Sequence, residues 1–454
     1  MVFALILLAA VADWVPVRWI SGEPKSLELL AETPMNCLML EEAHWSAELS
    51  AAAAGRGLVT LGVIRPGSDT AAAAGRAMAA RLNGVVLEGD FETEVAQYVR
   101  EGVGKAGGTV IELSPRGAVP FRDAGVITGT SQGVWPGLHA QEDGAVRAAP
   151  TGTPWVDTNT GFLRFARAAT SATIWIAYEP PKKGIIQPTR YIQAICDAAL
   201  TGARWIVTLD GEFARRLLAR DAVALKTWRE MGAYLRYFEN HKEWRQYEPH
   251  AGLAVVQDAD SGALLAGSIL DMVAVKNTPV RPVPRWKLEA ESLKGSKMAV
   301  SVDRESLTPE QTEVLRGFAR AGGTLLSGPA GWRFPAARRD QVTMGKEDVE
   351  RLDALWKGVN SMVGRSNLGA RLFNVSSMLT NLLQGPGGKP VVLHLANFSG
   401  YPVENVTAQF PDAYKRAKLL TPDAAARDLE LYPTEDGTAV DIPEVPGFAT
   451  LILD

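Results

Sequence analysis

Short apolar segments alternate with longer amphipathic segments over residues 17–240. The short segments are apolar on both sides, as strands of a parallel sheet are when helices cover the sheet. The segments between them have the apolar spacing of helices, with predicted helices at 70–82, 92–105, 161–169, 190–201 and 213–238. The predicted strands are 36–41, 58–64, 84–87, 109–113, 125–128, 155–157, 173–177 and 204–209.

Eight strand and helix units in roughly 225 residues favour a closed (β/α)8 barrel over an open sheet. The sixth strand, 155–157, rests on its spacing from its neighbours rather than on its own pattern. In such a barrel the chemistry lies at the carboxyl ends of the strands, so candidate site residues are sought there.

The pattern changes after residue 247. Strands at 253–257, 298–302 and 324–326, with a helix at 308–321, predict a small α/β domain. After residue 386 only short strands separated by turn residues follow. The fold class is therefore predicted as α/β, with a TIM-like barrel followed by a flavodoxin-like α/β domain and an antiparallel β-domain. The expected boundaries are 13–247 for the barrel, 248–335 for the α/β domain, 336–385 for a connecting segment and 386–454 for the β-domain.

Composition excludes several classes of protein. The 454 residues hold 47 lysines and arginines against 51 aspartates and glutamates, a net charge of −4, with no basic run. That balance argues against nucleic-acid binding. Two cysteines, Cys37 and Cys196, are too few for a disulfide scaffold or a structural zinc site. Five histidines without paired spacing predict no metal, and no organic cofactor is implied.

The amino-terminal run 2–12 is apolar but too short to span a bilayer. It is similar to the apolar region of a secretory signal peptide, and Ala10-Val11-Ala12 before Asp13 has the form of a cleavage site, although no basic residue precedes the run. The alternative is a buried first strand of a cytoplasmic protein. We expect a secreted or periplasmic protein, otherwise a cytoplasmic one, with no membrane segment in the mature form.

Two segments carry a family resemblance. Residues 298–328, MAVSVDRESLTPEQTEVLRGFARAGGTLLSG, run strand, helix, strand, and residues 391–406, VVLHLANFSGYPVENV, form a hairpin pattern. The first resembles the trimerisation domain, and the second the C-terminal β-module, of glycoside hydrolases of the trimeric β-galactosidase type. The resemblance implies a carbohydrate ligand and self-association into a homo-oligomer. The Asn-Glu pair that these enzymes carry after the fourth strand does not occur in this sequence.

Glycoside hydrolysis needs two carboxyl groups, one that donates a proton and one that acts as nucleophile or base. The resemblance implies that Glu179, at the end of the seventh predicted strand, is the nucleophile or base. Glu112, in the presumed fourth strand, is the positional candidate for the acid, provided that it points into the barrel, where burial raises a carboxyl pKa. The alternatives are that Glu179 pairs with Lys182 or Lys183, and that Glu112 pairs with an arginine.

Other polar and aromatic residues at predicted strand ends are candidates for substrate binding. Glu88 and Asp90 are two apart in an extended chain, so they point the same way. Trp155, Asp157 and Asn159 combine a stacking face with hydrogen-bonding groups, as a sugar requires. Alternatively, Asp90 and Asn159 cap the helices that follow them.

Three further candidates complete the set. Trp135 lies on the long segment 129–154, which exceeds ordinary loop lengths, and Tyr178 precedes Glu179. Asp210 follows the eighth strand, where it either faces ligand or caps a helix. The sequence thus predicts a glycoside-hydrolase-like protein acting on a neutral oligo- or polysaccharide. The alternatives are a catalytically silent carbohydrate-binding or scaffold protein, and a structural assembly subunit whose own loops close the barrel.

Overall fold

The computed structural model describes residues 11–136, 138–140, 146–148, 158–181, 184–257, 277–302, 304–328, 346–364, 369–375 and 377–454. The candidates Trp155 and Asp157 lie outside these residues, as do the predicted strand 155–157, most of the apolar run 2–12, and both Lys182 and Lys183.

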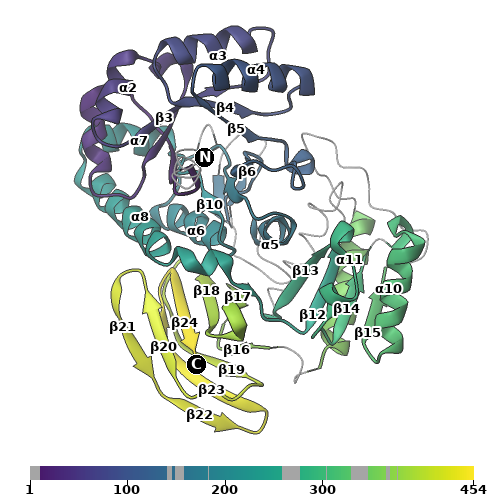
Figure 1. Ribbon diagram of the computed structural model, residues 1–454. Coiled ribbons are helices and arrows are strands. Elements are labelled where there is room, and N and C mark those ends of the chain that lie inside the picture. Colours follow the sequence, from purple (N-terminus) through teal and green to yellow (C-terminus); the bar gives the residue numbers. More distant parts are fainter. Residues whose placement is uncertain are drawn as a thin grey trace.

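Eight parallel strands form a barrel in which their order in the sheet follows their order in the chain (Figure 1). The sheet is closed through Val17 and Val207: the amide of Arg18 donates to the Val207 carbonyl over 2.8 Å, and the amide of Val207 donates to the Pro16 carbonyl over 3.2 Å. The predicted TIM-like barrel is therefore confirmed. Its strands are β1 (Pro16–Arg18), β2 (Cys37–Leu40), β3 (Val59–Ile64), β4 (Gly84–Glu88), β5 (Thr109–Leu113), β6 (Ile127–Thr130), β9 (Thr173–Ile176) and β10 (Arg204–Trp205).

The helices pack around the outside of the barrel (Figure 1). They are α2 (Ala47–Ala54), α3 (Thr70–Ala79), α4 (Thr93–Lys105), α5 (Thr160–Ala169), α6 (Pro188–Ala199), α7 (Gly211–Leu218) and α8 (Ala222–Asn240). Side-chain caps begin some of them, as where Ser46 accepts from the Leu49 amide and Asp221 from the Ala224 amide. A short hairpin, β7 (Leu138–Ala140) with β8 (Val146–Ala148), lies within the segment expected to be a long loop.

The numbering of the barrel strands differs from the prediction. The sequence does not predict the first strand, β1, because it is only three residues long and begins with a proline. Pro16 is tolerated because it is the first residue of the strand and uses only its carbonyl there. The first five predicted strands are consequently the second to sixth strands of the barrel. Glu88 ends the fourth strand, and Glu112 lies in the fifth.

The second unit is a four-stranded parallel sheet in the order β13 (Val280–Pro284), β12 (Leu253–Gln257), β14 (Met298–Ser301) and β15 (Thr324–Ser327). Helix α10 (Pro309–Arg320) begins with a capping box between Thr308 and Gln311 and buries Leu315 on one face of the sheet. Helix α11 (Lys346–Met362) contributes Leu355 to the core on the other face. The predicted small α/β domain is confirmed as a three-layer unit.

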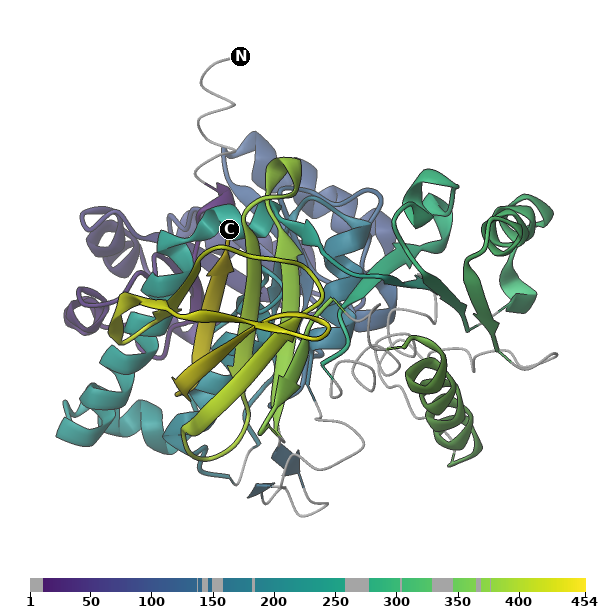
Figure 2. The same ribbon diagram turned by 90° about the horizontal axis from the view of Figure 1, so that it is seen from below.

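The carboxyl-terminal part consists of two antiparallel sheets around one core, as predicted (Figure 2). One sheet has the order β11 (Glu248–Pro249), β17 (Met378–Gln384), β18 (Val391–Asn397), β24 (Phe448–Leu453), β20 (Ala417–Thr421) and β21 (Ala424–Leu429). The other has the order β16 (Arg371–Phe373), β19 (Val403–Phe410), β23 (Gly437–Val445) and β22 (Leu431–Thr434). Helix α8 joins this unit to the barrel, since the hydroxyl of Tyr237 donates to Thr450 over 2.8 Å. Within the described ranges no helix is long and apolar enough to cross a membrane.

Candidate active site at the barrel mouth

Alternate residues of each barrel strand point inward, and on several strands the inward row ends in a charged side chain at the carboxyl end. Leu61 and Val63, for example, belong to the core inside the barrel, and Arg65, two residues further along, points to the same side. Glu179 likewise follows the inward residues Trp175 and Ala177 at a spacing of two. We call the resulting group the mouth cluster: Arg18, Glu41, Arg65, Glu88 and Glu179.

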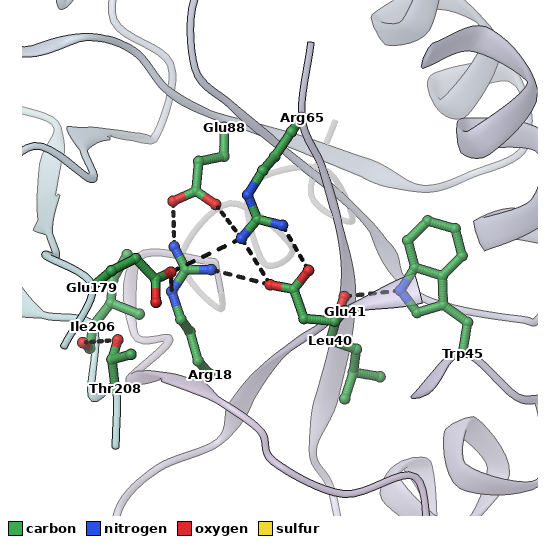
Figure 3. Close-up of polar contacts among 9 residues, drawn as sticks. All are labelled: Arg18, Leu40, Glu41, Trp45, Arg65, Glu88, Glu179, Ile206 and Thr208. Atoms are coloured by element: carbon green, nitrogen blue, oxygen red, sulfur yellow. Dashed lines mark hydrogen bonds and ion pairs between the residues drawn. The ribbon is translucent and has the colours of Figure 1, made fainter. Parts of the chain in front are cut away.

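Arg18 lies buried at the centre of the mouth cluster, and each nitrogen of its guanidinium faces a different glutamate (Figure 3). Its Nη2 pairs with Oε1 of Glu88, its Nη1 lies 3.5 Å from Oε1 of Glu41, and its Nε lies 3.5 Å from Oε1 of Glu179. One arginine from β1 therefore connects residues at the ends of β2, β4 and β9.

Arg65 is the second link. It forms a two-pronged pair with Glu41, at 2.6 and 2.8 Å. Its Nη2 also lies 3.1 Å from Oε2 of Glu88 and 3.9 Å from Oε1 of Glu179. Burial alone would raise the pKa of the Glu41 carboxyl, but the hydrogen bond and charge of Arg65, with the charge of Arg18, outweigh it and lower that pKa. The pair with Glu41 likewise raises the pKa of Arg65.

Glu88 and Glu179 have contrasting surroundings within the mouth cluster. The Glu88 side chain is 7% exposed and the Glu179 side chain 60%. Because both approach the same nitrogen of Arg65, their nearer oxygens are at most about 7 Å apart, a spacing on the scale of hydrolytic carboxyl pairs. A hollow of about 400 Å³ lined by Glu179, Pro181 and Leu209 opens beside Glu179, while Glu88 does not line it. The site thus combines a buried and an accessible carboxyl group next to a space open to ligand.

Glu112 is not brought to this site. Its neighbours Ile111 and Leu113 face the barrel interior, so the alternation of the strand turns Glu112 outward, where it pairs with Arg100 of α4 over 2.8 Å. Asp90, which is exposed, and Glu112, which is partly buried, line a separate hollow of about 450 Å³ outside the barrel. The alternative stated for Glu112, a pair with an arginine, is the arrangement found.

Two of the other candidates are buried and take part in packing or helix capping. The ring of Trp135 packs edge-on against Tyr191 and Trp205, with centroids 5.4 and 5.1 Å away, between the barrel and its helices. Asp210 accepts hydrogen bonds from the amides of Glu212 and Phe213, so it caps α7, the alternative role stated for it. It also contributes to the lining of the hollow beside Glu179. Tyr178 is exposed beside Glu179 and remains a candidate for ligand contact.

Asn159 belongs to a buried polar network behind the barrel wall. It stands at the start of α5, but its side chain forms no cap; the amide oxygen accepts from the Val134 amide over 2.8 Å. Its side-chain nitrogen donates to Asp197 over 2.8 Å, and the Thr160 hydroxyl donates to the same carboxyl over 2.6 Å. Burial raises the pKa of Asp197 to about 6, although these hydrogen bonds oppose the shift.

The raised pKa of Asp197 predicts a pH-dependent stability. The folded protein holds this proton more tightly than the unfolded chain, so the stabilising contribution is complete below pH 3.8 and is lost as the pH rises through about 6. At about 1.4 kcal/mol for each pKa unit, the loss is roughly 3 kcal/mol. Asp197→Asn keeps hydrogen-bonding groups at these positions and does not ionise. Urea unfolding at pH 4 and pH 7 should show the variant gaining stability relative to the wild type at pH 7; a difference independent of pH would contradict the assignment.

Sequence reasoning missed Arg18, Glu41 and Arg65, three of the five residues in the mouth cluster. Glu41 and Arg65 each directly follow an apolar strand in step with its inward residues, so the period of two was the signal available for both. Arg18 gave no such signal because β1 itself was not recognised. Among the described residues, no group of three or more His, Cys, Asp or Glu side chains is arranged to hold a metal ion.

Comparison with known proteins gives structural matches only. No family model matches the sequence, and no curated protein matches it significantly. The chain superposes on alpha-L-fucosidase isoenzyme 2 from Paenibacillus thiaminolyticus with a TM-score of 0.60 and 10% identity, over 97% of this chain and 98% of that one. A rhamnosidase from Novosphingobium sp. PP1Y gives 0.48 and 13% identity over 80% of this chain, which spans 38% of that enzyme.

These matches concern the fold, because the identities are so low. This chain has a glycoside-hydrolase-like fold with a TIM-like barrel. The sequence resemblance to glycoside hydrolases is confirmed at that level. The narrower part, the trimeric β-galactosidase type with its trimer formation, is not shown by these structures.

Proposed function

We propose that this protein is a glycoside hydrolase that cleaves a neutral oligo- or polysaccharide at the mouth cluster, with Glu88 and Glu179 as its two carboxyl groups. The observation that carries the proposal is that two glutamates from barrel strands three positions apart, β4 and β9, converge on the same two arginines and share Nη2 of Arg65, while Glu179 lines an open hollow. Two carboxyl groups at such a spacing are what glycoside hydrolysis requires. The glycosidase-like fold supports the same ligand class.

The surroundings of the two glutamates suggest their roles. Glu88 is a buried carboxylate ion-paired with Arg18 and Arg65, so its position is fixed, as a nucleophile or a base for water requires. Glu179 is more exposed and has longer contacts, of 3.5 and 3.9 Å, so it can turn toward the oxygen of a leaving group. These roles replace the pairing of Glu179 with Glu112 expected from the sequence.

Substrates with different leaving groups test both the sugar that the protein cleaves and the role of Glu179 as the acid. We expect the wild type to hydrolyse one or more glycosides in a panel that includes α-L-fucosides, α-L-rhamnosides and β-D-galactosides. Glu179→Gln should slow an oligosaccharide, whose leaving group needs a proton, by at least about 100-fold, and slow the nitrophenyl glycoside of the same sugar much less. Equal losses on both substrates would contradict the role of Glu179 as acid.

A second candidate function is carbohydrate binding without catalysis. The observation that favours it is that all three glutamates of the mouth cluster are already engaged by Arg18 and Arg65. In that case the wild type would hydrolyse nothing in the panel, while an oligosaccharide would still raise its melting temperature.

A further inference from the structure

A second cavity, of about 670 Å³, lies where the barrel meets both other units. Helices α5 and α6 end at this side and lead into β9 and β10, so the cavity is at the amino end of the barrel, opposite the mouth cluster. Figure 1 shows α5 beside β13, with β17 following below. We call it the junction cavity; residues of α5, β13 and β17 all contribute to its wall.

The junction cavity is strongly cationic in a protein that is acidic as a whole. Six cationic side chains line it against two carboxylates, Glu248 and Glu291, whereas the whole chain has a net charge of −4. The cationic residues are Arg164, Arg167, Arg245, Arg281, Lys287 and Lys294.

Three of these cations are bonded to neutral acceptors. Arg167 donates to the backbone carbonyl of Arg245, Lys287 donates to the carbonyl of Ala168 over 2.8 Å, and Arg281 donates to the carbonyl of Lys294 over 2.7 Å. Within the ranges that the structure describes, none of the three contacts a carboxylate. A backbone carbonyl satisfies the N–H donor of such a side chain, but it does not neutralise the positive charge.

The pKa values of two of these cations show that their surroundings disfavour the charged form. Burial lowers the pKa of Arg167, and the charge of Arg245 lowers it further. Burial also lowers the pKa of Lys287. A purely structural role, in which cations satisfy carbonyls at the ends of helices, accounts for the individual hydrogen bonds. Arg245 is paired with Glu239 over 2.5 Å, and Lys294 is paired with Glu291 over 2.9 Å. With Glu239 counted beside Glu248 and Glu291, the six cations still exceed the carboxylates by three, and a structural role does not account for that excess around one cavity large enough for a ligand.

We propose that the junction cavity binds a phosphate or sulfate group, either as the free ion or as an ester carried by a saccharide. Guanidinium and ammonium groups are the side chains that bind such oxyanions most strongly, and here they converge from two structural units. The hydroxyls of Thr170 and Ser171 line the same cavity and add neutral hydrogen-bonding groups. This proposal does not depend on hydrolysis at the mouth cluster.

The test is thermal unfolding and titration calorimetry of the full chain with inorganic phosphate, at constant ionic strength set with chloride. We expect a saturable rise in melting temperature in phosphate and measurable heat of binding. Lys287→Gln, at an exposed position, should weaken phosphate binding at least 10-fold, and so should Arg167→Gln. Lys226→Gln, an exposed lysine on α8 outside the cavity, is the matched control and should bind phosphate like the wild type.

Two further ligands identify the source of the oxyanion. Tighter binding of glucose 6-phosphate or glucose 6-sulfate than of inorganic phosphate would indicate an esterified saccharide, and equal binding would indicate the free ion. The proposal is overturned if phosphate has no more effect than chloride, or if Lys287→Gln and Arg167→Gln bind phosphate as tightly as Lys226→Gln does.

Discussion

Glu88→Gln is expected to lower the free energy of unfolding at pH 7 by roughly 3–5 kcal/mol, the range found when one partner of a buried ion pair is removed. Glutamine keeps the shape of the side chain, so no void forms. The buried Arg18 loses its closest counter-charge and keeps contacts of 3.5 Å to Glu41 and Glu179. Urea unfolding followed by circular dichroism measures the loss.

Glu112→Gln is the matched control for this result. It also breaks a glutamate–arginine pair, at 2.8 Å to Arg100, but the side chains of Glu112 and Arg100 are 28% and 42% exposed. Water screens such a pair, so the expected loss is at most about 1 kcal/mol. Losses of the same size in Glu88→Gln and Glu112→Gln would show that Glu88 is not the buried anchor of the mouth cluster.

Acidification from pH 7 to pH 4 is expected to remove roughly 3 kcal/mol of stability through His394 alone. Burial between α8 and the carboxyl-terminal sheet, together with the charge of the nearby His241, lowers the pKa of His394 to about 3. Its Nδ1 lies 3.0 Å from the Thr450 hydroxyl, and its ring lies against Trp244 and Phe448. A proton on this imidazole has no counter-charge in those surroundings.

The sign of this effect follows from proton binding. Between pH 6.5 and about 3 the unfolded chain binds the proton and the folded chain does not, so stability falls as the pH falls, by about 1.4 kcal/mol per unit. Asp197 acts in the opposite direction over part of this range, so the cleanest comparison is made in the Asp197→Asn background. There, adding His394→Phe should flatten the dependence of stability on pH between 7 and 4.

The control is His250→Gln, a partly exposed histidine 3.2 Å from Asp412, which should leave the slope nearly unchanged. The slope is the quantity to compare, because loss of the Thr450 contact in His394→Phe costs stability equally at every pH. A slope that persists in His394→Phe would mean that another group carries the acid sensitivity.

Much of the fold can be predicted from the sequence because most barrel strands are apolar on both faces. The segments 58–64 and 84–87, for example, pack against a core on each side, and their pattern clearly predicts β3 and β4. Helix α10 begins where Thr308-Pro309 predicts a cap and a first turn. The three-residue β1 is different: its place depends on closure against Val207, a contact nearly two hundred residues away that no local pattern reveals.

The site was less predictable than the fold for the same reason. Missing β1 shifted every strand number before the seventh, so Glu112 was placed in the fourth strand where Glu88 belongs. Glu179 was found because the seventh strand kept its number, and it does lie at the barrel mouth. That Glu88 faces inward and Glu112 outward follows from alternation within each strand, once the inward residues Val86 and Ile111 are known.

The central claim is that Glu88 and Glu179 form the hydrolytic pair and that Glu112 does not belong to it. The most direct test is kcat/KM for an oligosaccharide substrate in the wild type and in Glu88→Gln, Glu179→Gln and Glu112→Gln, at a temperature where circular dichroism shows all four folded. We predict losses of at least about 100-fold in the two mouth variants and less than about twofold in Glu112→Gln. Activity that survives in Glu88→Gln and Glu179→Gln, or that disappears in Glu112→Gln, would contradict the account.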